Sequence, residues 1–364
     1  MSKRGENIYK RKDGRWEGRY KNGFKPNGKV KYTSVYGKTY ADVRKIIAEK
    51  RLNNNIDCVS CKLTVKELFA LWLNNIRNSV KESTYTNYVM KLEKHILPYF
   101  NSIRYEKLTT EFLNKFIEIK FLEGYSSKYV YDIAVLIRSV SRFAHKYYNY
   151  ADKAEFMKMP KREPCKEKPM LSSEQYTILI TALKKDISPS NAGILLSAFT
   201  GIRLGELCAL KWSDIDFEKR IIIVRKTMQR IKNSDGQSKT KIIITSPKSR
   251  TSIREIPVPD WILSSLSKLK REDDSYFLTG KNSFIEPRTM QYRFKALLKK
   301  LNLPYINFHT LRHMFATRCV AVGFDVKTLS EILGHSTVEL TLNRYVHSSL
   351  ERKRQCMSML SEVF

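Results

Sequence analysis

Acidic residues are scarce in this sequence relative to basic ones. The chain has 36 Asp and Glu against 67 Lys and Arg, which gives a formal net charge of +31 over 364 residues. A surplus that served only solubility would cost self-repulsion in the folded chain. The charge therefore indicates a polyanionic partner, either nucleic acid or an anionic membrane surface, and leaves the chemistry open.

Long apolar runs are also missing. The first residues, MSKRGENIYK, are polar and basic, and no stretch approaches the ~20 apolar residues that a bilayer requires. We therefore expect a cytoplasmic protein with no membrane partner. With 42% hydrophobic and 11% aromatic residues, the chain can bury substantial cores, and its length predicts two or three domains.

Paired cysteines are nearly absent. Cys58 and Cys61 form the single C-x-x-C motif, whereas a structural zinc site requires four ligands, typically from two such pairs. The remaining cysteines are Cys165, Cys208, Cys319 and Cys356. We expect all six to be thiols, and we expect neither a metal nor a cofactor.

Residues 1–57 predict a small β-rich domain. Aromatic residues recur in short runs broken by Asp13-Gly14 and Asn22-Gly23, which are hairpin-turn signals, so we expect three strands and then a helix over residues 41–52. Sixteen Lys or Arg stand against six acids here. Basic and aromatic residues alternating on a sheet would suit a groove of DNA, and the alternative is an ordinary solvated face. We assign DNA contacts to five residues of this segment: Lys10, Arg11, Arg15, Trp16 and Arg19.

The rest of the chain is predicted to be mostly helical. Thr64 and Glu67 form a capping-box pattern ahead of an amphipathic run, and four basic, tyrosine-rich helices are expected over residues 64–150. Residues 151–169 contain three prolines and read as a linker. Residues 170–364 form the last domain, in which three β-branched runs between 220 and 259 predict a small antiparallel sheet. The fold class is mainly α with small antiparallel β-sheets, in several domains.

Histidine and arginine gather in the last domain. Four of the six histidines, His309, His313, His335 and His347, lie within the final 56 residues. His309 and Arg312 are three apart on a predicted helix, and an arginine beside a would-be metal site favours an anion instead. Arg203 begins another helix, with Glu206 as an i+3 partner, and Gly334 is expected to end a helix directly before His335.

The motifs TGIRLGELCALKW, HTLRH and LGHS, followed by Tyr345, resemble the signature of the tyrosine recombinase (phage integrase) family. Each motif alone is weak evidence, but the motifs in this order in a chain of this charge are specific for the family. The chain looks most similar to conjugative-transposon and lambda-like integrases. The resemblance implies an arm-binding domain at 1–57, a core-binding domain at 64–150 and a catalytic domain at 170–364.

The resemblance also implies roles for six catalytic residues. Arg203, Arg312 and His335 correspond to the residues that hold the scissile phosphate, and His309 to a group that transfers protons. Lys248 corresponds to the hairpin lysine that protonates the leaving 5′ oxygen, and Tyr345 to the nucleophile. Other residues of the same types stay open as alternatives: Lys226, Lys239 and Lys241 for the lysine, Tyr276, Tyr292 and Tyr305 for the tyrosine. His313 and His347 are interpreted as supporting or surface residues.

The implied activity is site-specific recombination for integration and excision of a mobile element, through a 3′-phosphotyrosyl intermediate and a Holliday junction. Its partner is double-stranded DNA at core and arm sites, bound by a homo-tetramer, and an accessory DNA-bending or excision protein is left open. The energy of the ester is kept in the phosphotyrosine bond, so the absence of a GxxxxGK[ST] motif fits this chemistry. Two alternatives are a non-catalytic DNA-binding relative and a type IB topoisomerase. The apolar residues of the tail, Met357, Met359, Leu360 and Val363, would dock on a neighbouring subunit or on their own domain.

Overall fold

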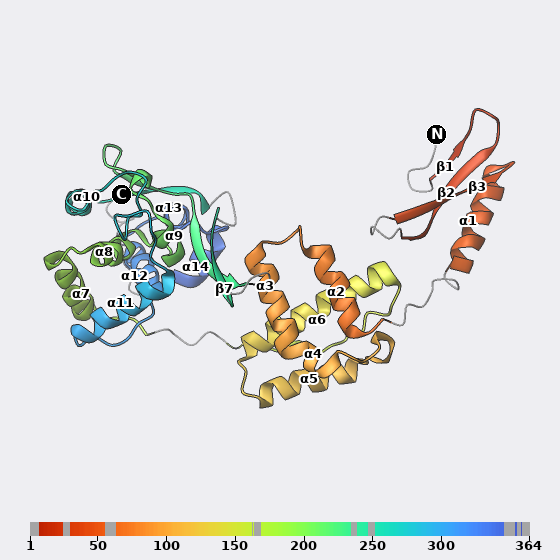
Figure 1. Cartoon of the computed structure of the whole chain (residues 1–364), viewed down its shortest axis with the longest axis horizontal. Coiled ribbons are helices and arrows are strands. Elements are labelled where there is room, and N and C mark those ends of the chain that lie inside the picture. The colour runs from red at the N-terminus through yellow and green to blue at the C-terminus, as the bar shows by residue number, and fades with distance from the viewer. Residues whose placement is uncertain are drawn as a thin grey trace. The chain divides into compact units, whose positions relative to one another are not determined.

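The computed structural model describes residues 7–24, 30–54, 63–161, 163, 169–233, 239–246, 252–345, 354 and 358. The prediction of a mainly helical chain with small antiparallel sheets is confirmed (Figure 1). The chain divides into two compact units, one of residues 1–80 and 88–163, the other of residues 81–87 and 164–364. The division into an arm-binding, a core-binding and a catalytic domain stays a prediction.

The N-terminal segment is a three-stranded antiparallel sheet with one helix on its face (Figure 1). The strands are β1 (Ile8–Lys10), β2 (Trp16–Phe24) and β3 (Val30–Gly37), and the helix is α1 (Tyr40–Asn54). Ile8 and Tyr20 of the sheet and Val43 and Ile47 of α1 are buried between them. Gly18 permits the close approach, because a Cβ there would lie 2.5 Å from Ile47 Cδ1.

One of the two predicted turns in this sheet is wrong. At Asp13-Gly14 the turn is present, with Gly14 at a φ of 85° and the Arg11 N–H donating to the Arg15 carbonyl. At Asn22-Gly23, however, β2 continues to Phe24, and its register with β3 shifts between Lys21 and Phe24. A glycine inside a strand often marks such an irregularity. The pair therefore interrupts the strand's pairing without ending the strand.

The next segment is helical, as predicted. It contains α2 (Val65–Ile76), α3 (Glu82–Lys91), a π-helical turn η1 (Leu92–Ile96), α4 (Leu97–Phe100), a 3-10 turn η2 (Tyr105–Lys107), α5 (Thr110–Leu122) and α6 (Ser127–Tyr148). Thr64 forms the predicted capping box, its hydroxyl accepting from the Glu67 N–H while the Glu67 carboxylate accepts from the Thr64 N–H. Ala154 and Met157, in the predicted linker, are buried in the core of this segment.

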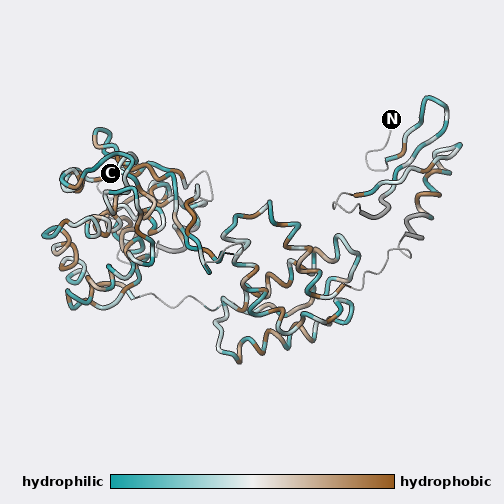
Figure 2. Tube along the Cα trace, in the orientation of Figure 1, coloured by the Kyte–Doolittle hydropathy of each residue, from teal (hydrophilic) through white to brown (hydrophobic). Residues whose placement is uncertain are grey.

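The last segment is built around α8 (Pro189–Thr200), which is buried along most of its length. Five helices contact it: α7 (Ser173–Lys185), α9 (Leu204–Ala209), α10 (Asp260–Ser267), α11 (Pro287–Lys300) and α12 (Phe308–Ala321). The other helices described in this segment are η3 (Trp212–Asp214), α13 (Val326–Leu333) and α14 (Val338–Tyr345). In Figure 2, α8 is among the most hydrophobic stretches of the trace, as a helix surrounded by others should be.

The strands of this segment form two sheets where the sequence predicted one. β4 (Ile215–Asp216), β5 (Ile221–Val224) and β8 (Arg254–Pro257) form one, and β6 (Thr227–Lys232) and β7 (Thr240–Thr245) form a separate hairpin. The third predicted run therefore pairs with β5 and not with β7. No helix in the described part of the chain is both long and apolar enough to cross a bilayer.

Candidate active site and DNA-binding face

Arg203 is positioned by two helix ends. α8 ends at Gly201, whose φ of 63° turns the chain, and Arg203 then caps the start of α9. Its backbone N–H donates to Glu206 Oε2 at 3.0 Å and its Nη1 donates to Glu206 Oε1 at 2.8 Å. Its Nη2 donates to the carbonyl of Gly334, more than a hundred residues away, at 2.9 Å. About a third of the side chain is exposed, so the predicted pairing with Glu206 leaves the guanidinium accessible.

Arg312 lies on α12 and is buried, with 3% of its surface exposed. Its Nη1 donates to the Gly201 carbonyl at 2.8 Å and its Nη2 to the Leu333 carbonyl at 2.6 Å. Arg312 therefore bridges the turn that precedes Arg203 and the end of α13.

His335 follows directly. As predicted, α13 ends at Gly334, which has a φ of 63°. Leu333 and Gly334, whose carbonyls bind Arg312 and Arg203, are adjacent, so the structure brings Arg203, Arg312 and His335 to one helix end. His335 Nδ1 lies 2.8 Å from the hydroxyl of Thr341, which is fully buried in α14.

Tyr345 is the last residue of α14, one helical turn after Thr341. The hydrogen bond between Thr341 and His335 therefore ties the helix of the predicted nucleophile to the site. The side chain of Tyr345 lies outside the described part of the structure, as do Lys248 and His347. The other candidate tyrosines contact different residues: Tyr276 lies near Lys211, Tyr292 accepts from Arg288, and Tyr305 lies near Lys295.

His309 lies in the first turn of α12, three residues before Arg312. Its backbone N–H donates to Asn307, which caps the helix, and its ring packs edge-on against that of His313, with centroids 4.8 Å apart. The structure thus places His309 on the helix of Arg312 and gives His313 a packing role beside it.

Sequence reasoning missed two residues here, Arg254 and Thr341. Arg254 Nη2 donates to Glu206 Oε2 at 2.9 Å, and both side chains are buried. Burial raises the pKa of the Glu206 carboxyl, but the charges of Arg254 and Arg203 and their hydrogen bonds outweigh it and hold that pKa below its ordinary value. A signal existed for Arg254: it shares the buried side of its strand with Ile256, where an apolar residue is usual.

Metal-binding residues do not gather in the described part of the chain, where no group of three or more His, Cys, Asp or Glu lies suitably placed. Cys208 and Cys319 are buried free thiols, and burial raises their pKa to about 12 and about 11. Cys58, Cys61, Cys165 and Cys356 lie outside the described residues.

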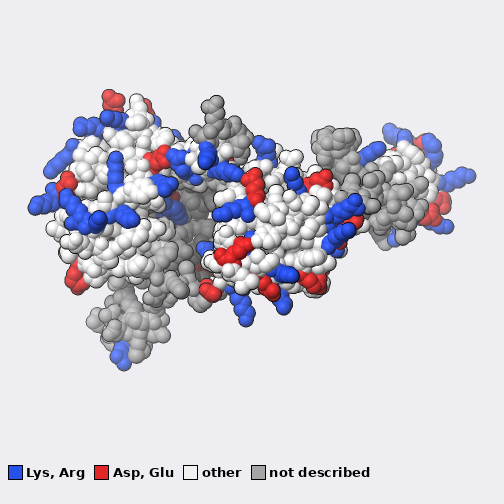
Figure 3. All heavy atoms as spheres, turned by 60° about the horizontal axis from the view of Figure 1, so that its bottom comes forward, with Lys and Arg blue, Asp and Glu red and all other residues white. Residues whose placement is uncertain are grey.

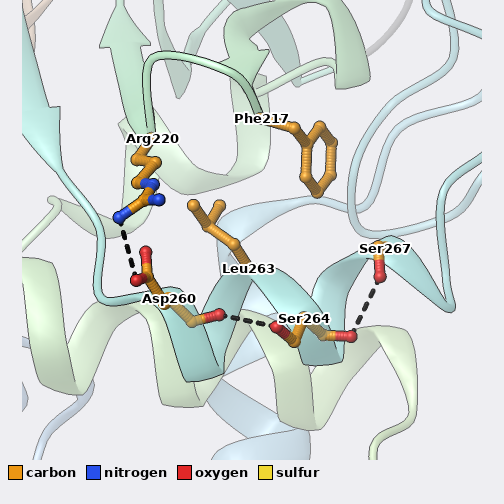
Figure 4. Close-up of a pocket in the computed structure, with 6 residues that line it drawn as sticks. All are labelled: Phe217, Arg220, Asp260, Leu263, Ser264 and Ser267. Carbon is orange, nitrogen blue, oxygen red and sulfur yellow. Dashed lines mark hydrogen bonds and ion pairs between the residues drawn. The ribbon is translucent and has the colours of Figure 1, made fainter.

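A shallow surface hollow lies apart from these residues (Figure 4). It is lined by Phe217, Arg220, Asp260, Leu263, Ser264 and Ser267, and an ion pair of 2.9 Å joins Arg220 to Asp260. It contains none of the predicted catalytic residues.

The exposed face of the N-terminal sheet gathers basic and aromatic side chains. The guanidinium carbons of Arg11 and Arg15 lie 5.6 and 5.9 Å from the ring centre of Tyr36, and that of Arg19 lies 5.9 Å from the ring centre of Tyr9. Beneath them, the buried Glu17 accepts from Arg11 and Arg19. This face, formed by Arg11, Arg15, Arg19, Tyr9 and Tyr36, is called the arginine face below.

Two of the five predicted DNA contacts do not belong to the arginine face. Trp16 is half-buried, and its ring packs edge-on against Tyr40 of α1, with centroids 5.3 Å apart. Lys10 is exposed but pairs with Trp16 in the register of β1 and β2, so it shares the side of the sheet that faces α1. Both therefore lie on the side of the sheet that carries α1, and their contact with DNA stays a prediction.

Comparison with known proteins identifies the family. The sequence model of the phage integrase family matches residues 169–352, which is 184 of the 364 residues. The chain belongs to the phage integrase family. A second model, the N-terminal SAM-like domain of phage integrases, matches residues 64–121. This integrase is thus a tyrosine recombinase, an enzyme that breaks and rejoins DNA strands.

Two curated relatives align with most of the integrase. The tyrosine recombinase XerC-like protein of Caldanaerobacter subterraneus subsp. tengcongensis is 28% identical over 382 residues, covering 93% of each chain. The ICEBs1 integrase of Bacillus subtilis is 24% identical and covers 81% of this chain and 82% of the relative.

Two solved structures share the fold. The Tn1549 transposon integrase in complex with circular intermediate DNA has a TM-score of 0.65 at 25% identity, covering 82% of this chain and 100% of that one. A lambda integrase tetramer bound to a Holliday junction has a TM-score of 0.56 at 17% identity, covering 94% and 98%. At that lower identity the likeness shows the fold alone.

Proposed function

We propose that this integrase cuts and rejoins DNA through Tyr345 to integrate and excise a mobile element. In this proposal Arg203, Arg312 and His335 hold the scissile phosphate, and His309 and Lys248 move protons. The observation that carries it is the meeting of Arg203 and Arg312 on the adjacent carbonyls of Leu333 and Gly334, directly before His335.

The arrangement suits a phosphodiester in its transition state. Attack on phosphorus builds negative charge on the non-bridging oxygens, and donors that are already oriented stabilise this charge without reorganising. Each arginine is oriented by a backbone carbonyl, and the His335 ring is oriented by Thr341. These fixed contacts set the direction of the donors before DNA binds.

The reaction exchanges one ester for another. The Tyr345 oxygen attacks phosphorus, a bond forms between the phenolic oxygen and the 3′ phosphate, and the bond to the 5′ oxygen breaks. The phenol, with an ordinary pKa of about 10, gives its proton to His309, and Lys248 protonates the leaving 5′ oxygen. Attack by a 5′ hydroxyl on the phosphotyrosine reverses these steps, so resealing consumes no ATP.

The assembly and the task follow from the relatives. ICEBs1 integrase and the Tn1549 transposon integrase belong by name to mobile elements, and lambda integrase is bound as a tetramer to a Holliday junction. We extend these features to this chain: a homo-tetramer on double-stranded DNA, in the cytoplasm, with the arginine face on arm sites and residues 64–150 on core sites. An accessory DNA-bending or excision protein would complete the complex.

A covalent trapping assay tests this function. The full chain is incubated with a nicked duplex spanning an end of the element, with EDTA and without ATP, and the products are resolved on a denaturing gel. We expect an adduct at the 3′ phosphate with wild type and none with Tyr345→Phe. Tyr292→Phe and Tyr305→Phe are matched controls, because both tyrosines are more than half exposed, and each should form the adduct normally.

The other outcomes identify which part of the proposal fails. An adduct that persists in Tyr345→Phe and disappears in one of the control variants would move the nucleophile to that tyrosine. Tight DNA binding with no adduct from any variant would favour a non-catalytic DNA-binding protein. Relaxation of supercoiled DNA without sequence preference would favour the topoisomerase alternative.

A further inference from the structure

Three arginines bind three consecutive carbonyls at the end of α13. Arg254 Nε donates to Ile332 at 2.6 Å, and Arg312 and Arg203 donate to the next two carbonyls, at 2.6 and 2.9 Å. The guanidinium groups come from β8, α12 and the start of α9. The C-terminal end of a helix carries partial negative charge and unsatisfied carbonyls, so these cations stabilise it. His335 follows this helix end immediately.

Arg254 donates to protein groups from each of its three guanidinium nitrogens. Its Nε donates to Ile332, its Nη1 to the Ser252 carbonyl at 3.2 Å, and its Nη2 to Glu206 at 2.9 Å. Only 5% of its side chain is exposed. Because these three nitrogens hold the helix end, Ser252 and Glu206, we assign Arg254 a supporting role and no direct contact with the phosphate of DNA.

Gly334 is fitted to this side chain. Its φ of 63° favours glycine, and a Cβ at this position would lie 3.0 Å from Arg254 Cδ, 3.1 Å from its Nη1 and 3.2 Å from its Nε. Because glycine has no side chain, Arg254 can pack against the turn at Gly334 that directly precedes His335.

Glu206 links Arg254 to Arg203. Its Oε2 accepts from Arg254 Nη2, and its Oε1 accepts from Arg203 Nη1. Arg254 thus contacts both the helix end before His335 and the carboxylate that orients Arg203. We propose that Arg254 is a positioning residue of the integrase, which aligns His335 and Arg203 on the scissile phosphate. This inference rests on the catalytic roles proposed above for those two residues.

Charge is one part of this role. Among the described residues, the charged groups that lower the pKa of Glu206 are Arg254 of β8 and Arg203 at the start of its own helix, and they act against burial. Without the cation of Arg254, burial would raise the pKa of Glu206, and the carboxyl would be protonated at higher pH. A neutral Glu206 holds the Arg203 guanidinium more weakly, so cleavage should then fail at a higher pH than in wild type.

Three variants separate the charge of Arg254 from its shape. Arg254→Met removes the cation, Arg254→Lys keeps a charge but loses the planar fork, and Arg254→Met/Glu206→Gln also removes the titrating carboxyl. For each, the single-turnover rate of covalent cleavage is measured from pH 5 to 9 with a saturating nicked duplex. The dissociation constant for the same duplex and the melting temperature are measured in parallel.

We expect Arg254→Met to bind the duplex as wild type does but to cleave it more slowly. The loss of cleavage rate should be roughly 10- to 100-fold, by analogy with the loss seen when a hydrogen-bond partner that orients a metal-ligating residue is removed. The acidic limb of its pH profile should move to higher pH. Arg254→Lys should keep that limb in place while losing part of the rate, and the double variant should not show the shifted limb.

The opposite results would overturn the inference. If Arg254→Met cleaved at the wild-type rate at every pH, Arg254 would have no positioning role. A rate loss explained fully by weaker DNA binding or by unfolding would also contradict that role. If Arg254→Met does not fold, Arg254→Lys decides: a folded Arg254→Lys with the full wild-type rate would contradict positioning by the fork. Tyr345→Phe is assayed alongside, and an adduct from that variant would mean that the catalytic assignment has failed, whatever Arg254 does.

Discussion

Arg203 and Arg312 differ sharply in exposure although we assign both to the same phosphate. About a third of the Arg203 side chain is exposed, whereas Arg312 is buried and donates to two backbone carbonyls. A lysine at position 312 could not make both contacts, because an ammonium lacks the planar fork of a guanidinium. Arg312 thus has a structural duty beside its proposed catalytic one, and its replacement should disturb the turn at Gly201.

Thr341 offers a milder test of the site than either arginine. Thr341→Val keeps the side-chain shape but removes the hydroxyl that lies 2.8 Å from His335 Nδ1. The imidazole would lose its orientation and α14 its tie to the site, so we expect cleavage to slow roughly 10-fold, the low end for loss of an orienting partner, with DNA affinity unchanged. Single-turnover cleavage and duplex binding measure the two effects.

The matched control is Thr317→Val, on the exposed side of α12, which should cleave normally. Equal rates for Thr341→Val and wild type would show that His335 does not depend on this hydroxyl.

At the residue scale, the sequence located the groups that lie in motifs but not those that support them. Arg203, Arg312 and His335 were predicted from short patterns, and the structure brings them together. Arg254 and Thr341 were missed because their partners, Glu206 and His335, come from different elements, and no local pattern encodes such contacts. Only the polar residue on the buried side of β8 could have drawn attention to Arg254.

Elements were predictable where a cap or a glycine marks their ends. The capping box at Thr64 begins α2, and Gly334 ends α13. The Asn22-Gly23 turn was wrong because a glycine permits a strand irregularity as readily as a turn. The two sheets of the last segment were predicted as one, because strand pairing is decided by tertiary contacts and not by local composition.

Two glycine substitutions separate the backbone strain of a left-handed residue from the packing of Gly334 against Arg254. Gly334→Ala places a Cβ in the left-handed region and against Arg254, whereas Gly124→Ala, at a φ of 81°, meets no atom within 4 Å. Strain alone should cost roughly 1–2 kcal/mol. We expect Gly124→Ala to lose about that much stability, and Gly334→Ala to lose more and also to cleave slowly.

Urea unfolding and single-turnover cleavage measure the two losses. If Gly334→Ala cleaved as fast as wild type, the contact between Gly334 and Arg254 would be irrelevant to the site.

The whole molecule carries a charge of +31, and basic side chains outnumber acidic ones over the face drawn in Figure 3. Binding of such a chain to DNA should weaken steeply with salt, because each phosphate that is neutralised releases counterions. The charge alone does not say which basic residues contact DNA. In the arginine face, the guanidinium groups of Arg11, Arg15 and Arg19 lie over the rings of Tyr36 and Tyr9.

Arg15 is the member of the arginine face best suited to a test, because it pairs with the exposed Asp13 and not with the buried Glu17. We expect Arg15→Gln to weaken binding to arm-site DNA and to lower the slope of log K against log salt by about one. Core-site binding should be unchanged. Lys219→Gln, which removes an exposed charge after β4, is the control, and an unaltered slope in Arg15→Gln would make the face an ordinary solvated surface.

The central claim is that Tyr345 becomes linked to DNA, and mass spectrometry of the trapped adduct tests it most directly. Trypsin cuts after Lys327, Arg344 and Arg352, and Tyr345 is the only tyrosine between residues 328 and 352. After nuclease and trypsin digestion, the peptide YVHSSLER, or its longer form through Arg344, should carry the mass of the 3′-linked nucleotides. The same mass on a peptide containing Tyr276, Tyr292 or Tyr305, with YVHSSLER unmodified, would contradict the account.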